Sequence, residues 1–360
     1  MSPRPIVGRR TGVATIAAAG AAAAAYRFAV LYRGRAGFPQ QHPPRFSPVD
    51  FGLPFEETVV GSPGGRLPAW FVPARGGARG PAVLLVHGWE SARDRTLPNI
   101  RLLNAAGFHC LTFDVRGHGA NPPEELPVSV AEFGADALAG LRELLARPEV
   151  TRAGILGHSL GGVGAILAAA DEPRTAAVVS ASAPSGPVFL TRQTFRLARL
   201  PFPDPVAYPL AWLTTRVYVR PRGHAISELS ASRALARYRG PLMLVHGEAD
   251  SVVPPANLRR LEHAATAARK DREASSIETL AIPGGEHSWL YEHETYRRSV
   301  AGFLARAFGG PLTSDEAEER AAAIECVRLP EADPPFPAVA GRPRGLAVLR
   351  AMVATRRPEA

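Results

Sequence analysis

The sequence predicts an α/β fold with a doubly wound, mostly parallel sheet of about eight strands and a short helical cap insertion. Short, strongly apolar runs recur along the chain, and stretches with helical periodicity separate them. The runs are apolar throughout rather than alternating, which is typical of strands that helices cover on both faces. Together, these observations indicate a central parallel sheet with helices on each side.

The elements follow in order along the chain. A hairpin is expected from the segments 55–60 and 67–72, which flank a Gly-rich turn. The apolar runs lie at 82–86, 108–113, 153–156, 176–180, 242–245 and 277–282, and helices are expected at 93–106, 128–146, 159–170, 255–268 and 290–308. The interval between the fourth and fifth runs is too long for a plain loop. It predicts a cap at about 185–238, with helical patches at 195–200 and 229–238, inside a single domain spanning 55–308.

Residues 1–35 form a hydrophobic N-terminal segment, expected to be an anchor or a signal. Its apolar core, Val13–Tyr26, is short for a spanning helix, which needs about 20 residues, and suits the apolar region of a secretory signal. If Arg27 extends to the headgroups, the stretch from Val13 to Tyr32 is long enough to span. We therefore expect membrane association through residues 11–32. Export, or a cytoplasmic protein with a soluble alanine-rich helix, are the alternatives.

Two further segments flank the predicted domain. Residues 36–54 are rich in Pro, Phe and Arg and are expected to form a linker or an extended arm. Residues 309–360 form a Pro-rich tail with an acidic patch at its start, which we expect to be partly disordered or wrapped on the surface. Cys110 lies in an apolar run and Cys326 in the polar tail, so no disulfide framework is expected.

The net charge of +9 raises the question of a nucleic-acid partner. The arginines are scattered, Lys270 is the only lysine, and no aromatic side chains alternate with the basic residues to stack on bases. A nucleic-acid groove is therefore not expected.

A nucleophile is predicted where a buried strand meets a helix. Gly157-His-Ser159-Leu-Gly161 matches G-x-S-x-G directly after the apolar run 153–156 and directly before a helix of small residues. The strand must turn sharply into the helix, so the residues two before and two after Ser159 must lack side chains. Gly157 and Gly161 meet that requirement, and the hydroxyl of Ser159 would then stand above the sheet.

A serine nucleophile needs a base, and the base needs an acid that orients it. Asp250 follows the run 242–245, and His287 follows the run 277–282. Both are therefore placed at the carboxyl ends of parallel strands, where sites of open α/β sheets lie. We expect Ser159, His287 and Asp250 to converge as nucleophile, base and acid.

Other residues near these positions are alternatives. Glu248 could replace Asp250 as the acid, although Asp250 stands immediately before a Val-Val-Pro break and is favoured. His246 is expected to pack at the end of its strand. The side chain of His158 is expected to point away from the reacting centre, and His118 is expected to organise its loop.

The oxyanion that develops during acyl transfer needs two hydrogen-bond donors. The backbone N–H of Leu160, the residue after the nucleophile, is expected to be one, and the N–H of Trp89, after the run 82–86, the other. The histidines and cysteines form no metal-ligand pattern, and the glycines form no dinucleotide or phosphate loop, so neither a metal nor a cofactor is expected.

From about Phe55 to Phe308 the chain resembles the α/β-hydrolase superfamily. The resemblance is carried by these motifs: Val86-His-Gly-Trp89, Phe113-Asp-Val-Arg-Gly-His-Gly119, Gly157-His-Ser-Leu-Gly-Gly162, His246-Gly-Glu-Ala-Asp250 and Gly285-Glu-His287. More narrowly, it looks like bacterial hydrolases with a hydrophobic N-terminal segment and a short cap. The resemblance implies esterase, lipase or peptidase-like activity on carboxyl derivatives.

The sequence thus predicts a serine hydrolase that cleaves small-molecule carboxylic esters through an acyl-serine intermediate. A peptidase or aminoacyl hydrolase with the same triad is one alternative, and a non-catalytic α/β-hydrolase used for binding is another. Aromatic residues of the cap could line an acyl pocket or pack the cap itself. These are Phe195, Phe202, Tyr208 and Trp212. The sequence leaves acyl specificity and oligomeric state open.

Overall fold

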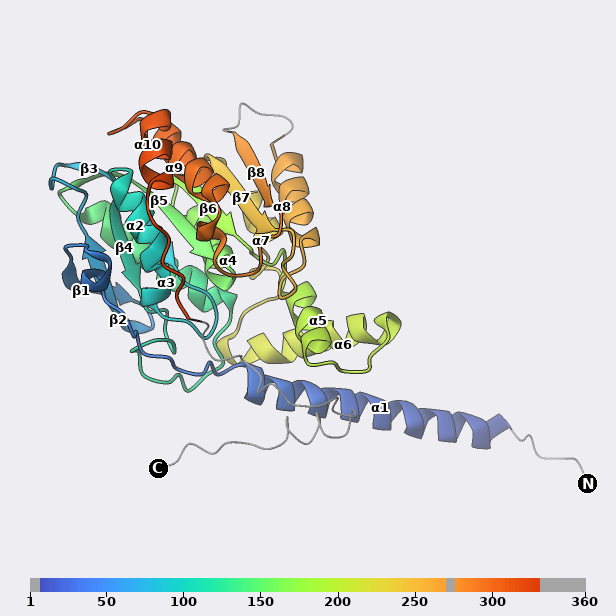
Figure 1. The fold of residues 1–360 in the computed structure, drawn as a ribbon. Coiled ribbons are helices and arrows are strands. Elements are labelled where there is room, and N and C mark those ends of the chain that lie inside the picture. The colour runs from blue at the N-terminus through green and yellow to red at the C-terminus, as the bar shows by residue number, and fades with distance from the viewer. Residues whose placement is uncertain (1–6, 270–275, 331–360) are drawn as a thin grey trace, which may run out of the picture.

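A computed structural model describes residues 7–269 and 276–330. Its centre is an eight-stranded sheet in the order β1-β2-β4-β3-β5-β6-β7-β8 (Figure 1). The strands are β1 (Glu56–Ser62), β2 (Gly65–Val72), β3 (Gly80–Val86), β4 (His109–Phe113), β5 (Val150–His158), β6 (Thr175–Ala181), β7 (Leu242–Gly247) and β8 (Ile277–Ile282). β1 and β2 form an antiparallel hairpin, β2 is antiparallel to β4, and every other neighbouring pair is parallel.

Helices cover both faces of this sheet. One face carries α3 (Val130–Ala146), α4 (Leu160–Asp171), α7 (Ala231–Leu235) and α8 (Ala256–Ala267), and the other carries α2 (Leu97–Ala105), α9 (Glu294–Phe308) and α10 (Ser314–Ala322). Strand β3 shows why the apolar runs are continuous: Leu84 packs into one core, and its neighbours Val83 and Leu85 pack into the other. The predicted doubly wound, mostly parallel sheet is confirmed.

Two helices between β6 and β7 stand apart from the sheet, and we call the pair α5 (Pro187–Leu197) and α6 (Asp204–Val219) the cap. Sequence patterns predicted only short helical patches here. They missed α6 because Pro209 lies inside it, and proline in a helix interior removes a backbone hydrogen bond and normally breaks the helix. The patch predicted at 229–238 forms the shorter α7, which packs on α4 and α8 instead of on the cap.

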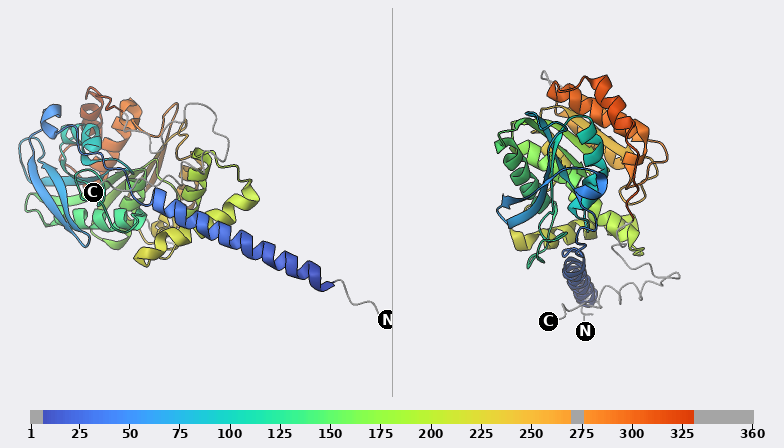
Figure 2. Two further views of the ribbon diagram at one scale, coloured as in Figure 1. Left: turned by 90° about the horizontal axis from the view of Figure 1, so that it is seen from below. Right: turned by 60° about the vertical axis from the view of Figure 1, so that its left-hand side comes forward.

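The N-terminal segment is one continuous helix, α1 (Val7–Ala36), that runs beside the cap and projects beyond it (Figures 1 and 2). Its stretch Ala14–Ala36 is long and apolar enough to cross a membrane. Near its C-terminal end, Tyr32 is almost fully buried, and its hydroxyl lies 2.5 Å from the Thr194 hydroxyl of α5. The Tyr218 hydroxyl of α6 donates to the carbonyl oxygen of Ala36. The last turns of α1 therefore belong to the packed structure of the cap.

The arm after α1 and the segment after α9 both lie on the surface of the sheet domain. In the arm, the amide of Gln40 donates to Glu90 at 3.0 Å, and the amide of Arg45 donates to Asp94 at 2.8 Å. A single-turn helix, η1 (Pro48–Phe51), follows. After α9, the acidic patch forms α10 against α9, and the tail beyond it is fixed at the buried Leu329. The predicted tail from 331 to 360 lies outside the described residues.

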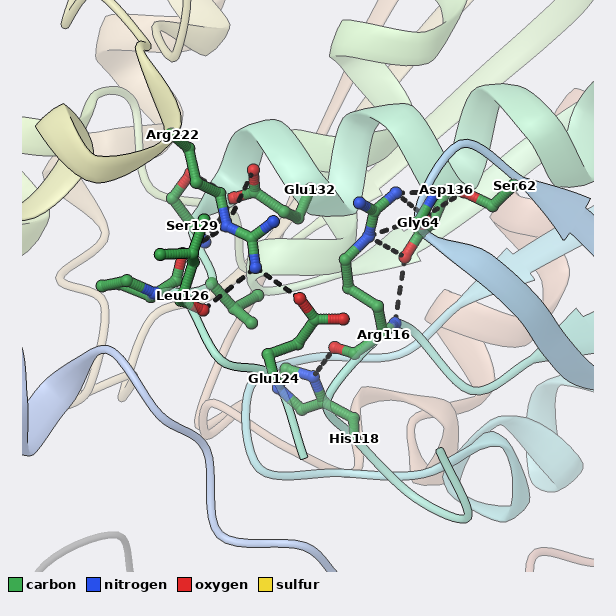
Figure 3. Close-up of polar contacts among 12 residues, drawn as sticks. Ser62, Gly64, Arg116, His118, Glu124, Leu126, Ser129, Glu132, Asp136 and Arg222 are labelled. Carbon is green, nitrogen blue, oxygen red and sulfur yellow. Dashed lines mark hydrogen bonds and ion pairs between the residues drawn. The ribbon is translucent and has the colours of Figure 1, made fainter. Parts of the chain in front are cut away.

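A network of buried ion pairs fastens the loop after β4 and the base of the cap to α3 (Figure 3). The Arg116 guanidinium binds Asp136 of α3, and both side chains are nearly inaccessible to solvent. Ser62 of β1 also donates to Asp136. Beside this cluster, Arg222, which follows α6, binds Glu124 at 2.5 Å and lies 3.5 Å from Glu132 of α3.

Removing Asp136 should be strongly destabilising, because Asp136→Ala leaves the buried Arg116 charge unpaired. We expect the free energy of unfolding to fall by about 3–5 kcal/mol in denaturant titrations at neutral pH. Arg298→Ala is the matched control. It removes an exposed pair with Glu294 one helical turn away and should cost no more than about 0.5 kcal/mol. Equal losses in the two variants would contradict this assignment of the buried pair.

Candidate functional site

Ser159 stands on a sharp turn between β5 and α4. Its backbone has φ 55° and ψ −120°, a region that non-glycine residues rarely adopt and that costs on the order of 1–3 kcal/mol. The glycines two positions away make the turn possible. A Cβ on Gly157 would lie 2.1 Å from the Gly161 carbonyl oxygen, and a Cβ on Gly161 would lie 2.2 Å from that of Val86. The Ser159 amide then donates to Ala181 at the end of β6 at 2.8 Å.

Three side chains from different loops meet at this turn. Asp250 follows β7 and His287 follows β8, so both lie at the carboxyl edge of the sheet beside the end of β5. The distance from His287 Nδ1 to Asp250 Oδ2 is 2.8 Å, and that from His287 Nε2 to Ser159 Oγ is 3.1 Å. A proton on Nδ1 donates to the carboxylate and leaves Nε2 unprotonated toward the serine hydroxyl. The structure thus brings together the three residues that the sequence selected.

The Asp250 carboxylate is completely buried, and its hydrogen bonds maintain its charge. Oδ1 accepts the amides of Val252 at 3.0 Å and Val253 at 2.8 Å, while His246 Nε2 lies 3.3 Å from Oδ2. Burial by itself raises the pKa of Asp250, but hydrogen bonds from His246 and His287 outweigh it and hold that pKa well below its usual value. Glu248, the alternative acid, is exposed. The geometry therefore favours Asp250 as the partner of His287.

The two predicted oxyanion donors lie on either side of the Ser159 turn. Leu160 is the first residue of α4, so its amide is one of the free N–H groups of a helix N-terminus. The loop carrying Trp89 approaches from β3, and a Cβ on Gly88 would lie 3.2 Å from that of Ser159. The Trp89 ring itself packs edge-on against the His118 ring, with 5.0 Å between the ring centroids. The side chain of Trp89 therefore packs against the loop after β4, while its backbone N–H stays the predicted second donor.

His87 fixes the orientation of the loop that carries the Trp89 amide. Its Nδ1–H donates to the Gly88 carbonyl oxygen at 2.7 Å, and its Nε2 accepts the Val115 amide at 3.0 Å. Both ring nitrogens are thereby assigned, and burial lowers the pKa of His87, which keeps the ring neutral. Because a trans peptide points its N–H away from its C=O, holding the Gly88 carbonyl also sets the direction of the Trp89 N–H.

His158 has a role that sequence reasoning missed. Its side chain was expected to point away from the reacting centre, but its Nε2–H donates to the backbone carbonyl oxygen of His287 at 2.6 Å. The two imidazole rings lie 4.9 Å apart. Desolvation, with the neighbouring His287 ring, lowers the pKa of His158 to about 4. A neutral His158 therefore fixes the loop that carries the predicted base, a contact between residues far apart in the sequence.

The remaining histidine of the motifs acts as the sequence predicted. His118 is completely buried, and its Nδ1–H donates to the Arg116 carbonyl oxygen at 3.0 Å, which stabilises the loop after β4. Within residues 7–269 and 276–330, no three His, Cys, Asp or Glu side chains are grouped so that they could hold a metal ion.

With this geometry established, the chain can be compared with known proteins. The sequence profile described as the Alpha/beta hydrolase family matches residues 83–299. An uncharacterised protein of Mycobacterium tuberculosis is 29% identical over 227 residues, which cover 62% of this chain and 69% of that protein.

Solved structures share the fold. An esterase of Pyrococcus furiosus superposes with a TM-score of 0.59 at 20% identity, covering 76% of this chain and 98% of the esterase. An acylaminoacyl peptidase of Pyrococcus horikoshii superposes with a TM-score of 0.55 at 17% identity, covering 75% of this chain and 45% of the peptidase. At such low identities these similarities concern the fold alone.

The buried histidines should make folding stability depend on pH. Burial lowers the pKa of His118 to about 3, below the ordinary value of about 6.5. Below pH 6.5 the unfolded chain therefore binds a proton that the folded chain does not, and stability is lost as the pH falls. We expect His118→Gln to reduce the slope of unfolding free energy against pH by up to about 1.4 kcal/mol per pH unit between pH 6 and 4.

The test compares denaturant titrations of the parent and His118→Gln between pH 6 and 4. A measurement at pH 7.5, where His118 is neutral in both the folded and the unfolded chain, gives the stability difference that does not depend on its protonation. Parallel plots of unfolding free energy against pH would contradict the assignment of a neutral, buried His118.

Proposed function

The chain belongs to the alpha/beta hydrolase family, and we propose that it hydrolyses carboxylic esters through an acyl-serine intermediate on Ser159. One observation carries the proposal. A continuous path of contacts runs from the Ser159 hydroxyl through His287 to the buried Asp250 carboxylate, with separations of 3.1 and 2.8 Å. This is the arrangement that a serine needs in order to become a nucleophile.

The proposed reaction has two halves. In the first, Ser159 Oγ attacks the ester carbonyl while His287 Nε2 takes the hydroxyl proton. The negative charge moves to the carbonyl oxygen, where the amides of Trp89 and Leu160 donate to it. The C–O bond to the alcohol then breaks, and the alcohol leaves with the proton from His287. In the second half, water attacks the acyl-serine by the same steps and releases the carboxylic acid.

Asp250 supports this cycle electrostatically. Its charge stabilises the imidazolium that His287 becomes in each half, and its hydrogen bond to Nδ1 keeps the correct tautomer facing the serine. Because hydrogen bonds hold the pKa of Asp250 low, the carboxylate stays ionised over the whole range in which the histidine can act as a base.

Amides are the other substrate class that the same residues could cleave, since acyl transfer to serine is common to esterases and peptidases. We favour esters because an alcohol is a better leaving group than an amine. A set of p-nitrophenyl esters of graded chain length, assayed beside aminoacyl amides, distinguishes the two classes.

We further propose that α1 anchors the protein to a membrane. The stretch Ala14–Ala36 has the length and composition of a spanning helix, and its residues as far as Arg27 are almost all exposed. Exposed apolar side chains such as Ile16 would be costly in water and favourable in lipid. A secretory signal has similar features, so fractionation of cells with and without residues 1–35 tests this proposal.

A fluorophosphonate probe should label the native protein at Ser159, because the contact with His287 activates that hydroxyl. Labelling is measured by fluorescence after electrophoresis and located by peptide mass spectrometry. Ser159→Ala should abolish it, while Ser251→Ala, next to the acid, should not. A modified peptide from any other serine would show that the nucleophile has been assigned wrongly.

Asp250→Asn should lower kcat by about 10⁴-fold. The asparagine amide would donate to Nδ1 and force the His287 proton onto Nε2, where it faces the serine instead of accepting its proton. Glu248→Gln is the matched control, since that exposed side chain lies two residues away, and it should retain near-parental turnover of a p-nitrophenyl ester. The reverse pattern would move the role of the acid to Glu248.

A further inference from the structure

The loop that joins α5 to α6 lies beside the point where α1 leaves the packed protein. We call the residues Leu197–Val206 the cap tip. The ring of Phe28 on α1 packs edge-on against two rings of the cap. Its centroid lies 5.6 Å from that of Phe202 in the cap tip and 5.5 Å from that of Phe195 in α5. Figures 1 and 2 show α1 continuing past the α5–α6 connection into open space. The cap tip is therefore next to the part of α1 that we propose is embedded in lipid.

The length of α1 places the surface of a bilayer next to the cap tip. The helical backbone from Thr11, which follows the paired Arg9 and Arg10, to Arg27, just before Phe28, contains 17 residues. It is about 26 Å long at the usual rise per residue, which is the lower limit for a spanning helix. The hydrocarbon core of a bilayer is about 30 Å thick. If that stretch crosses the core, the headgroup region begins where Phe28 meets the cap tip.

The side chains of the cap tip suit such a surface. Leu197 is 41% exposed and Val206 is 49% exposed, and exposed apolar side chains beside basic ones are typical of proteins that bind at membrane interfaces. Arg196, immediately before the tip, and Arg199 within it are both exposed. From Gly186 to Arg220 the sequence has five arginines and a single acidic residue, Asp204.

That single acidic residue does not offset the basic character of this surface. Asp204 pairs with Arg192 and lies 3.6 Å from Arg196, so its charge is matched within the cap. The surface that remains is apolar and positively charged. Its chemistry complements a bilayer that contains anionic phospholipids.

We propose that the cap tip enters the headgroup region of the same anionic bilayer that holds α1, and that the esters hydrolysed at Ser159 reach the site from that bilayer. The substrate class rests on the ester hydrolysis proposed above, and the membrane contact rests on the proposed anchoring by α1. The cap connects the two places directly. Gln193 of α5 donates to the Ser251 carbonyl oxygen at 3.2 Å, beside Asp250.

The insertion of the cap tip can be measured on the full chain in vesicles of phosphatidylcholine and phosphatidylglycerol. Cys110 is completely buried, so a Cys326→Ser background accepts a single fluorescent label at Val206→Cys. Quenching by lipids that carry a spin label near the headgroup reports contact. Val49→Cys is the matched control, because Val49 is also exposed, at 66%, but lies in η1 on the sheet domain. Ile16→Cys, probed with lipids that carry the spin label on the acyl chain, tests whether α1 is embedded, because Ile16 lies inside the proposed crossing.

We expect quenching at position 206 by the headgroup label and at position 16 by the acyl-chain label, and little quenching at position 49 by either. A label at 206 as poorly quenched as the label at 49 would overturn the proposed contact. Strong quenching at position 49, equal to that at position 206, would also overturn it, because the bilayer would then bind the protein without selecting the cap tip. An unquenched label at position 16 would overturn the embedding of α1 on which the geometry depends.

The supply of substrate has a separate test. We expect Leu197→Asp combined with Val206→Asp to slow hydrolysis of a long-chain ester dissolved in vesicles by at least about tenfold, since apolar contact is replaced by charge repelled from anionic lipid. Hydrolysis of a water-soluble short-chain ester should be unchanged. Val49→Asp should affect neither rate.

Equal rates for the variant and the parent on vesicles, or equal losses on both esters, would refute delivery from the bilayer. Fluorophosphonate labelling of Ser159 in the same samples keeps the two proposals separate. Labelling with no vesicle effect contradicts only this inference, whereas a parent protein that is not labelled contradicts the proposed function itself.

Discussion

The sharp turn at Ser159 is the constraint on which the rest of the site depends. A serine held at φ 55° is strained, and it persists because the surrounding backbone leaves no room for another path. Gly157 and Gly161 pass so close to neighbouring carbonyl oxygens that any side chain there would collide. The same closeness brings the end of β3, with Gly88, against the serine. The geometry of the turn thus also determines where an oxyanion would be held.

The other parts of the site are ordered by contacts that satisfy buried polar groups. Asp250 is oriented by two backbone amides, His87 orients the Gly88 peptide, and His158 holds the His287 loop. Each of these rings or carboxylates is fixed before any substrate arrives. In a partly dry site, such preorganised dipoles stabilise developing charge far better than mobile water would.

The parts of this arrangement that could be predicted from sequence are those encoded locally. A buried apolar run followed by Gly157-His-Ser159, or by Asp250 or His287, indicates both a strand and the loop at its carboxyl end. The contact of His158 with His287 could not be predicted, because it joins residues brought together only by the sheet. Helix α6 was missed for a related reason: Pro209 in its interior opposes helix formation, and packing against α1 and α5 compensates. In α6, tertiary contacts outweigh the low helix propensity of the local sequence.

The aromatic residues of the cap illustrate the same limit. From sequence alone they could line an acyl pocket or pack the cap, and α1 was considered separately from them. In the structure Phe195 is buried in a cluster with Phe28 and Tyr32 of α1. Because these rings are buried together, the cap cannot move away from α1 without exposing apolar surface. The position of α1 relative to a membrane would therefore set the position of the cap, and through Gln193 that of the loop carrying Asp250.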